Sequence, residues 1–150
     1  MVTFLDRLPE TGALLALDVS RRRIGVAGSD PTQTLVTPLI TIRRKRFVDD
    51  VAILARLCAE REVVALVVGL PLNMDGSIGP AAQSRRDVAA RLMSDLALPV
   101  LLQDERLTTE AVRQAIEEGR LRRPKPGAPL DHHAAAVILE DALHARRATR

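Results

Sequence analysis

The longest apolar stretch of the chain runs from residue 63 to residue 72 and contains one glycine and one proline. It is too short to span a bilayer, because a membrane helix needs about 20 apolar residues. Its first six residues, 63–68, are all apolar. Strands that are buried on both faces, as in parallel sheets, have such continuous apolar sequences. The stretch therefore predicts an inner parallel strand covered by helices on both sides.

Strand-like and helix-like segments surround this stretch in a defined order. Apolar or alternating segments typical of strands occupy 13–18, 24–29 and 36–42 before it and 99–103 after it. Helical spacing occupies 47–61, 79–96, about 109–118 and 131–146. The first of these helices should present Val48, Val51, Leu54, Ala55 and Cys58 on one face. This order predicts an α/β fold, in which an antiparallel meander extended by parallel crossovers forms a mixed five-stranded sheet with helices on both faces.

Length and composition narrow the class of protein. The 150 residues suit one domain over 1–150, and we expect short flexible ends at about 1–11 and 147–150. Hydrophobic residues make up 47% and charged residues 27%, as in soluble globular proteins. A single cysteine, Cys58, excludes a disulfide framework, so we expect a cytoplasmic protein without a membrane partner.

Acidic residues follow the predicted strands at one end. Asp18 closes the first strand, Asp104 and Glu105 close the fifth, and Asp131 opens the last helix. An unpartnered carboxylate is costly to bury, so Asp18 should face a cation, a cap or a ligand. Ligands of open α/β sheets bind outside the carboxyl ends of the strands. These acids are therefore candidates to converge at one sheet edge.

Two of these acids also have a structural explanation. Asp104 could cap or form a salt bridge with Arg106. Asp131 follows Pro129 and precedes a helix, so it suits a helix N-cap. Asp104 and Glu105 point to opposite sides if the strand alternation persists, so only one of them should reach a shared site. We favour Glu105 for that position, with Asp104 as the second choice.

Basic residues are clustered at 21–23, 43–46 and 120–125, although the net charge is only +3. Nearly all are arginines, whose planar guanidinium suits bidentate contact with phosphate. Each cluster alone is also explained by a solvated face. Three clusters around a candidate acidic site favour a polyanionic partner.

Several motifs occur in order: Val67-Val68-Gly69-Leu70-Pro71-Leu72-Asn73-Met74-Asp75-Gly76 with Gly79-Pro80 behind it, Asp104-Glu105-Arg106-Leu107-Thr108-Thr109, and Asp131 leading into Ala134-Ala135-Ala136-Val137-Ile138-Leu139. From about residue 14 to residue 143, the chain resembles the YqgF family, also called RuvX, which comprises Holliday junction resolvases with a ribonuclease H-like fold. The resemblance implies a metal-dependent nuclease acting on structured nucleic acid. Its chief implied role is maturation of the 5′ end of the small-subunit (16S) ribosomal RNA precursor in ribosome biogenesis.

The resemblance also implies roles for individual residues. Asp18, Glu105 and Asp131 would hold two Mg²⁺ or Mn²⁺ ions, with Asp18 bridging both ions and Asp104 as a further catalytic candidate. Nucleic-acid contacts would come from Arg22, Arg23, Asn73, Arg106, Arg122, Arg123 and Lys125. Turn chemistry is the other explanation for Asn73. Two features depart from the family pattern, namely Ser20 where glycine is usual, and His132 with His133 after the last acid.

Other functions remain open at this point. The partner could be pre-ribosomal RNA or branched DNA, and a junction resolvase would require a homodimer with two sites related by a two-fold axis. Only two aromatic residues, Phe4 and Phe47, occur, which argues against a stacking platform for single strands. The segment around Asp18 also resembles the first phosphate-binding turn of sugar kinases and actin-like ATPases, which need two such domains. A non-catalytic nucleic-acid-binding scaffold is the third alternative.

Overall fold

The computed structural model describes residues 4–73, 75–104, 117–119 and 131–148. Its centre is a six-stranded sheet in the order β1-β6-β5-β2-β3-β4. The strands are β1 (Phe4–Leu5), β2 (Ala13–Val19), β3 (Arg23–Ser29), β4 (Val36–Arg43), β5 (Val63–Leu70) and β6 (Val100–Asp104). β2, β3 and β4 form an antiparallel meander, and β5, β6 and β1 continue from β2 in parallel. The predicted mixed sheet is confirmed, with one strand more than the five we expected.

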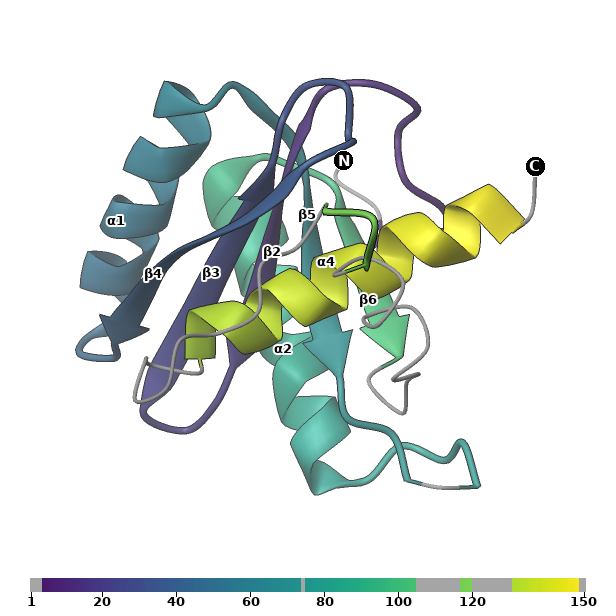
Figure 1. Cartoon of the computed structure of the whole chain (residues 1–150). Helices are drawn as coiled ribbons and strands as arrows, with labels where there is room; N and C mark the ends of the chain where they lie inside the picture. The colour runs from purple at the N-terminus through teal and green to yellow at the C-terminus, as the bar shows by residue number, and fades with distance from the viewer. Residues whose placement is uncertain (1–3, 74, 105–116, 120–130, 149–150) are drawn as a thin grey trace.

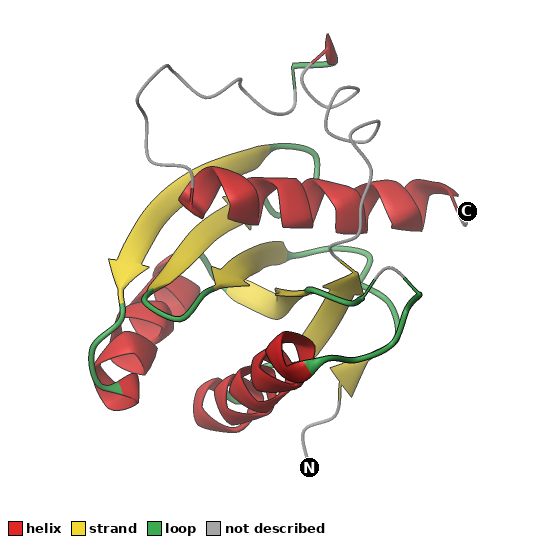
Figure 2. Cartoon of the chain, turned by 90° about the horizontal axis from the view of Figure 1, so that it is seen from below, coloured by secondary structure: helices red, strands yellow, loops and turns green. Residues whose placement is uncertain are grey.

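Helices cover both faces of this sheet, as predicted. α1 (Phe47–Glu60) and α2 (Pro80–Leu96) lie on one face, and α4 (Asp131–Ala148) crosses the other (Figures 1 and 2). α4 contacts β2, β3 and β4 most extensively and reaches β5 and β6 as well. The helix predicted at about 109–118 lies almost entirely outside the described residues. No described helix has the length and apolar character needed to cross a membrane.

Strand alternation divides the core into two layers. Leu15, Leu17 and Val19 of β2 pack with α1 and α2, whereas Leu14 and Ala16 pack under α4. β5 is buried along almost its whole length, as its continuous apolar sequence predicts. Each fully buried leucine contributes roughly 1.5–3 kcal/mol relative to exposure, so this double layer stabilises the strand ends that carry the candidate acids.

The N-terminal end that we expected to be flexible joins the sheet at Phe4–Leu5 and is buried at Leu8. β1 pairs in parallel with β6, and Leu8 is buried in the layer beneath α4. The Arg146 guanidinium donates to the Pro9 carbonyl at 2.9 Å, and the Gln33 amide donates to the same carbonyl at 2.9 Å. A two-residue strand has no periodicity to detect, and its apolar neighbours gain stability only through contacts made in the folded state.

The face of α1 also differs from the predicted one. Leu54 and Cys58 are buried, but Val48 is 66% exposed and Asp50 is buried in its place. The helix is thus rotated so that an acid, and not Val48, lies against the domain. Asp50 occupies the position four residues before Leu54, which lies on the same face of a helix.

Candidate active site

Asp18 lies near the carboxyl end of β2, on the face covered by α4. It follows Leu14 and Ala16 at intervals of two residues, and both of those side chains belong to the layer beneath α4. Its backbone partner on β3 is Gly25, which pairs in turn with Thr41 on β4. Gly25 has no side chain beside Asp18. Asp18 itself is partly buried, next to the last residue of its strand.

The start of α4 lies on the same face and at the same level of the sheet. Thr41 Oγ1 is 3.0 Å from His132 Nδ1, which ties the first turn of α4 to β4. Asp18, Gly25 and Thr41 thus form a row of paired residues that runs across three neighbouring strands, and Asp18 and Thr41 lie about 10 Å apart in it. Asp131, the first residue of α4, therefore begins its helix beside the row that contains Asp18. The side chain of Asp131 lies outside the described part of the structure.

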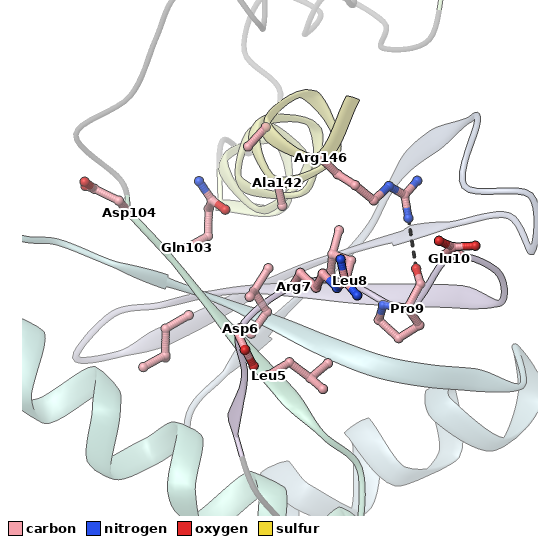
Figure 3. Close-up of a pocket in the computed structure, with 13 residues that line it drawn as sticks. Leu5, Asp6, Arg7, Leu8, Pro9, Glu10, Gln103, Asp104, Ala142 and Arg146 are labelled. Carbon is pink, nitrogen blue, oxygen red and sulfur yellow. Dashed lines mark hydrogen bonds between the residues drawn. The ribbon is translucent and has the colours of Figure 1, made fainter. Parts of the chain in front are cut away.

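The end of β6 approaches the same row from the other side. Gly69 of β5 pairs with Gln103, and Leu70 pairs with Asp104, so Gln103 is level with Asp18 two strands away. Figure 3 shows Gln103 directed toward α4 and Asp104 directed off the end of the strand. Glu105 itself is not among the described residues, so the choice between Glu105 and Asp104 stays a prediction.

A pocket lies at the other end of α4, away from Asp18. Its volume is about 890 Å³, and it is enclosed by the segment after β1, the end of β6 and the C-terminal half of α4 (Figure 3). Ala142, Ala145 and Arg146 line it from α4, and Asp104 is the one candidate acid among the described residues that line it. Ala142 is 11 residues from the start of α4, or about 16 Å along the helix. Asp18 does not line this pocket.

Asn73 lies in the loop that follows β5 and holds that loop together. Its side-chain amide donates to Ser77 Oγ at 3.0 Å, and its backbone N–H donates to the Ser77 carbonyl at 3.0 Å. Asp75 accepts from the backbone N–H and the hydroxyl of Ser77. Turn chemistry therefore accounts for the contacts of Asn73 in the structure. Its role in nucleic-acid binding stays a prediction.

The turn after Asp18 accommodates Ser20 without strain. The Ser20 backbone N–H and hydroxyl both donate to the Arg23 carbonyl, and the hydroxyl accepts from the Arg23 N–H at 3.2 Å. Ser20 is not among the residues with positive φ, so a glycine is not required there for backbone geometry. Arg22 and Arg23 are exposed at this turn. The other predicted contacts, Arg106, Arg122, Arg123 and Lys125, lie outside the described ranges.

His132 and His133, in the first turn of α4, lie next to the candidate site. Burial lowers the pKa of His133, and the neighbouring His132 lowers it further. His133 is thus held toward the neutral form. Within the described residues, no three Asp, Glu, His or Cys side chains are grouped closely enough to hold a metal ion. Two of the three proposed ligands, Glu105 and Asp131, have side chains beyond that part.

Comparison with known proteins then decides the family. Residues 12–145 match the RuvX family, described as Holliday junction resolvase. The chain belongs to the RuvX family. Its relatives include a protein from Cereibacter sphaeroides strain ATCC 17029, 47% identical over 140 residues, covering 93% of this chain and 88% of the relative. Another, from Bradyrhizobium sp. strain ORS 278, is 50% identical over 143 residues, covering 95% and 89%. Both carry the name "Putative pre-16S rRNA nuclease".

Solved structures place this RuvX chain among ribonuclease H-like folds. RuvC of Thermus thermophilus in complex with a Holliday junction substrate superposes with a TM-score of 0.59 at 14% identity, covering 92% of this chain and 97% of RuvC. Another Thermus thermophilus RuvC structure gives 0.58 at 13% identity, covering 91% and 97%. The predicted family and fold are confirmed. The family and fold also support a hydrolase acting on phosphodiester bonds.

Proposed function

We propose that this RuvX protein is a divalent-metal-dependent endonuclease that processes the 5′ end of pre-16S ribosomal RNA. The observation that carries the proposal is the position of Asp18 in one row with Gly25 and Thr41, and the contact of Thr41 with His132 at the start of α4. This row sets Asp18 beside the helix that begins with Asp131. The names of the relatives supply the substrate class.

The chemistry of the acids fits hard cations. Asp18, Glu105 and Asp131 would supply carboxylate oxygens, which are the ligands that Mg²⁺ and Mn²⁺ prefer, with Asp104 as the alternative to Glu105. Such ions lower the pKa of a water nucleophile and offset charge on the leaving oxygen. The role of Asp18 is to hold negative charge at an accessible strand end, where its partly buried position restricts its movement. The exposed Arg22 and Arg23 would neutralise backbone phosphates next to it.

Asp18→Asn tests the acid site with little change in shape. The substrate is an RNA that contains the 5′ leader of 16S ribosomal RNA. We expect its cleavage in Mg²⁺ or Mn²⁺ to fall by more than about 100-fold. Mutation of a residue that only hydrogen-bonds a metal ligand already lowers activity by about 10–100-fold, and Asp18 would be a ligand itself. Asp95→Asn is the matched control, because Asp95 is an exposed acid on α2. Mapping of the 5′ end of the product identifies the cut. Full activity of Asp18→Asn would refute the proposed site.

The same assay separates the alternatives. Cleavage of a four-way DNA junction without cleavage of the RNA would identify a junction resolvase instead. RNA binding that is unchanged by EDTA, with no cleavage in any divalent metal, would identify a non-catalytic scaffold.

A further inference from the structure

A second, strongly basic pocket lies near the turn that follows Asp18. Its volume is about 490 Å³, and it is lined by Arg21, Arg44, Lys45, Ser84 and Arg85. Arg21 belongs to the β2–β3 turn, Arg44 and Lys45 to the connection between β4 and α1, and the other two to the second turn of α2. Four cations from three segments thus converge, and none of the described residues that line the pocket is acidic. None of the four forms an ion pair with another described residue.

The pocket wall is held in place by backbone and side-chain hydrogen bonds. The Arg44 backbone N–H donates to the Arg22 carbonyl at 2.8 Å, and Arg44 Nη1 donates to the Ser20 carbonyl at 2.8 Å. The guanidinium has five N–H donors, so the bond to Ser20 leaves others for a ligand. Arg44 therefore joins the β4–α1 connection to the turn that carries Arg21.

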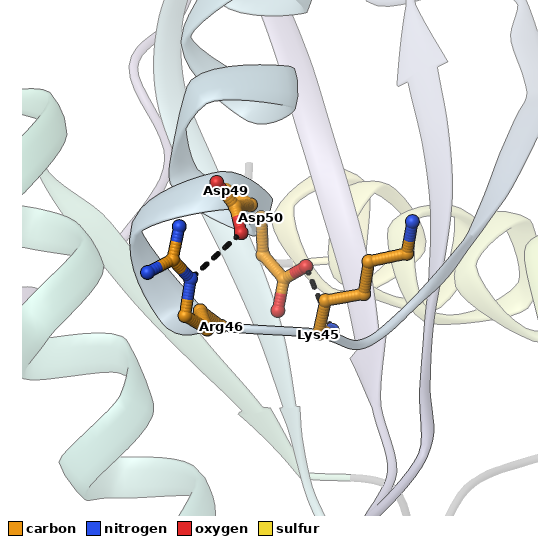
Figure 4. Close-up of polar contacts among 4 residues, drawn as sticks. All are labelled: Lys45, Arg46, Asp49 and Asp50. Atoms are coloured by element: carbon orange, nitrogen blue, oxygen red, sulfur yellow. Dashed lines mark hydrogen bonds and ion pairs between the residues drawn. The ribbon is translucent and has the colours of Figure 1, made fainter.

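The buried acid of α1 fixes the same connection from the other side. Asp50 is 2% exposed, and its Oδ1 accepts from the Lys45 backbone N–H at 3.3 Å. Figure 4 shows the Lys45 side chain extending away from this carboxylate, while Arg46 turns outward to pair with Asp49 at 3.3 Å. Asp50 does not line the pocket. Lys45 thus remains available to an anion, and its backbone is fixed.

The pocket is close to the proposed acid site but lies toward the opposite face of the sheet. Arg21 is three residues after Asp18, so their Cα atoms are at most about 10 Å apart. Asp18 lies on the α4 face, whereas α2, which lines the pocket, covers the opposite face together with α1 (Figure 2). A nucleic-acid strand at Asp18 that continues over the β2–β3 turn would reach the pocket within a few nucleotides, given about 3.4 Å of rise per nucleotide.

We propose that Arg21, Arg44, Lys45 and Arg85 form a subsite for one backbone phosphate of the substrate strand, a few nucleotides from the cleaved bond. This subsite rests on the proposed nuclease function and assigns these four residues a part in it. Its contribution is charge neutralisation and positioning of the strand, without reading of base sequence.

Binding in EDTA tests the subsite separately from cleavage. The probe is a labelled stem-loop RNA with a single-stranded 5′ extension, titrated with full-length protein at several KCl concentrations. We expect Arg85→Gln to weaken binding about three- to tenfold, and to lower the slope of log affinity against log salt by about one, as for loss of one phosphate contact. Arg56→Gln is the matched control, since Arg56 is an exposed arginine on α1, and it should stay within about twofold of wild type.

Replacing the backbone phosphates of the RNA one at a time locates the contact. A single uncharged methylphosphonate is moved along the RNA, and binding is compared between wild type and Arg21→Gln/Arg85→Gln. At one position the methylphosphonate should weaken binding by wild type but leave the double variant unchanged. Equal binding and salt slopes for Arg85→Gln and Arg56→Gln, absence of such a position, or absence of RNA binding by wild type would each overturn the subsite.

Cleavage measured in parallel distinguishes the two proposals. If Asp18→Asn keeps full activity while Arg85→Gln loses affinity, the phosphate subsite stands and the acid site fails. If Asp18→Asn is inactive while Arg85→Gln binds as the control does, the acid site stands and the subsite fails.

Discussion

Thr41→Val tests the contact that connects β4 with the start of α4. Valine keeps the shape and strand preference of threonine but has no hydroxyl, so the 3.0 Å contact with His132 Nδ1 is lost. The contact is partly buried and joins residues 91 apart in sequence. It therefore bears on how firmly the first turn of α4 is held against the sheet.

The expected cost follows from the environment of the contact. A hydrogen bond of this kind contributes a net of roughly 0.5–1.5 kcal/mol to the free energy of unfolding, because its two groups bind water instead when the protein unfolds. For a chain of this length, 1 kcal/mol corresponds to about 2–4 °C in Tm, which gives a decrease of about 1–6 °C. If α4 positions Asp131 as proposed, kcat should fall more than KM rises, since strand binding does not depend on this contact.

Thermal and urea unfolding measure the change in stability, with Thr37→Val as the control. Thr37 is exposed on the same strand, and no side-chain hydrogen bond joins it to the described residues. A double-mutant cycle with His132→Ala should give a coupling energy of about 0.5–1.5 kcal/mol. Equal unfolding free energies for the two threonine variants, or a coupling energy below about 0.3 kcal/mol, would refute the argument.

Three further predictions concern the layer beneath α1. Leu54→Ala should lower the free energy of unfolding by about 2–5 kcal/mol, because Leu54 is fully buried. Ile53→Ala is the control and should lower it much less, because Ile53 is 43% exposed. Equal losses of unfolding free energy for the two variants in chemical denaturation would contradict this. Burial raises the pKa of the Cys58 thiol to about 11, so folded protein at pH 8 should react with a thiol reagent far more slowly than unfolded protein. The raised pKa also favours the folded state below the ordinary thiol pKa, so this stabilisation should disappear as the pH rises through about 11. Equal labelling rates in water and in denaturant would show that the thiol is exposed.

Much of the fold could be predicted because its strands have strong local signals. The continuous apolar sequence of β5 indicates burial on both faces, and the three segments before it indicate a meander. β1 could not be predicted, because two residues contain no period and gain stability only from β6, nearly 100 positions away. The rotation of α1 was missed for a related reason, since an acid at a buried helix position contradicts the apolar pattern used to orient the helix.

The positions of Asp18 and Asp104 at strand ends could be predicted from the sequence, but the contacts around them could not. Asp18 and Asp131 follow from the rule that strand ends and helix starts meet at one sheet edge. The Thr41–His132 contact, which ties the first turn of α4 to β4, joins two residues with no sequence relationship. Asp50 did leave a signal, because it stands four residues before Leu54 in the apolar stripe of α1. A charged residue in such a stripe indicates a buried hydrogen-bonding role, here to the Lys45 backbone.

The turn between β2 and β3 links the acid face and the basic pocket mechanically. Ser20 closes the turn through its hydrogen bonds with Arg23, and its carbonyl accepts from Arg44. Glycine at this position would lack the hydroxyl and would widen the range of backbone conformations. The serine thus makes the turn stiffer where the family pattern has glycine. Because Asp18 precedes the turn and Arg21 lies within it, the proposed acid site and the proposed phosphate subsite should keep a fixed separation while the strand is bound.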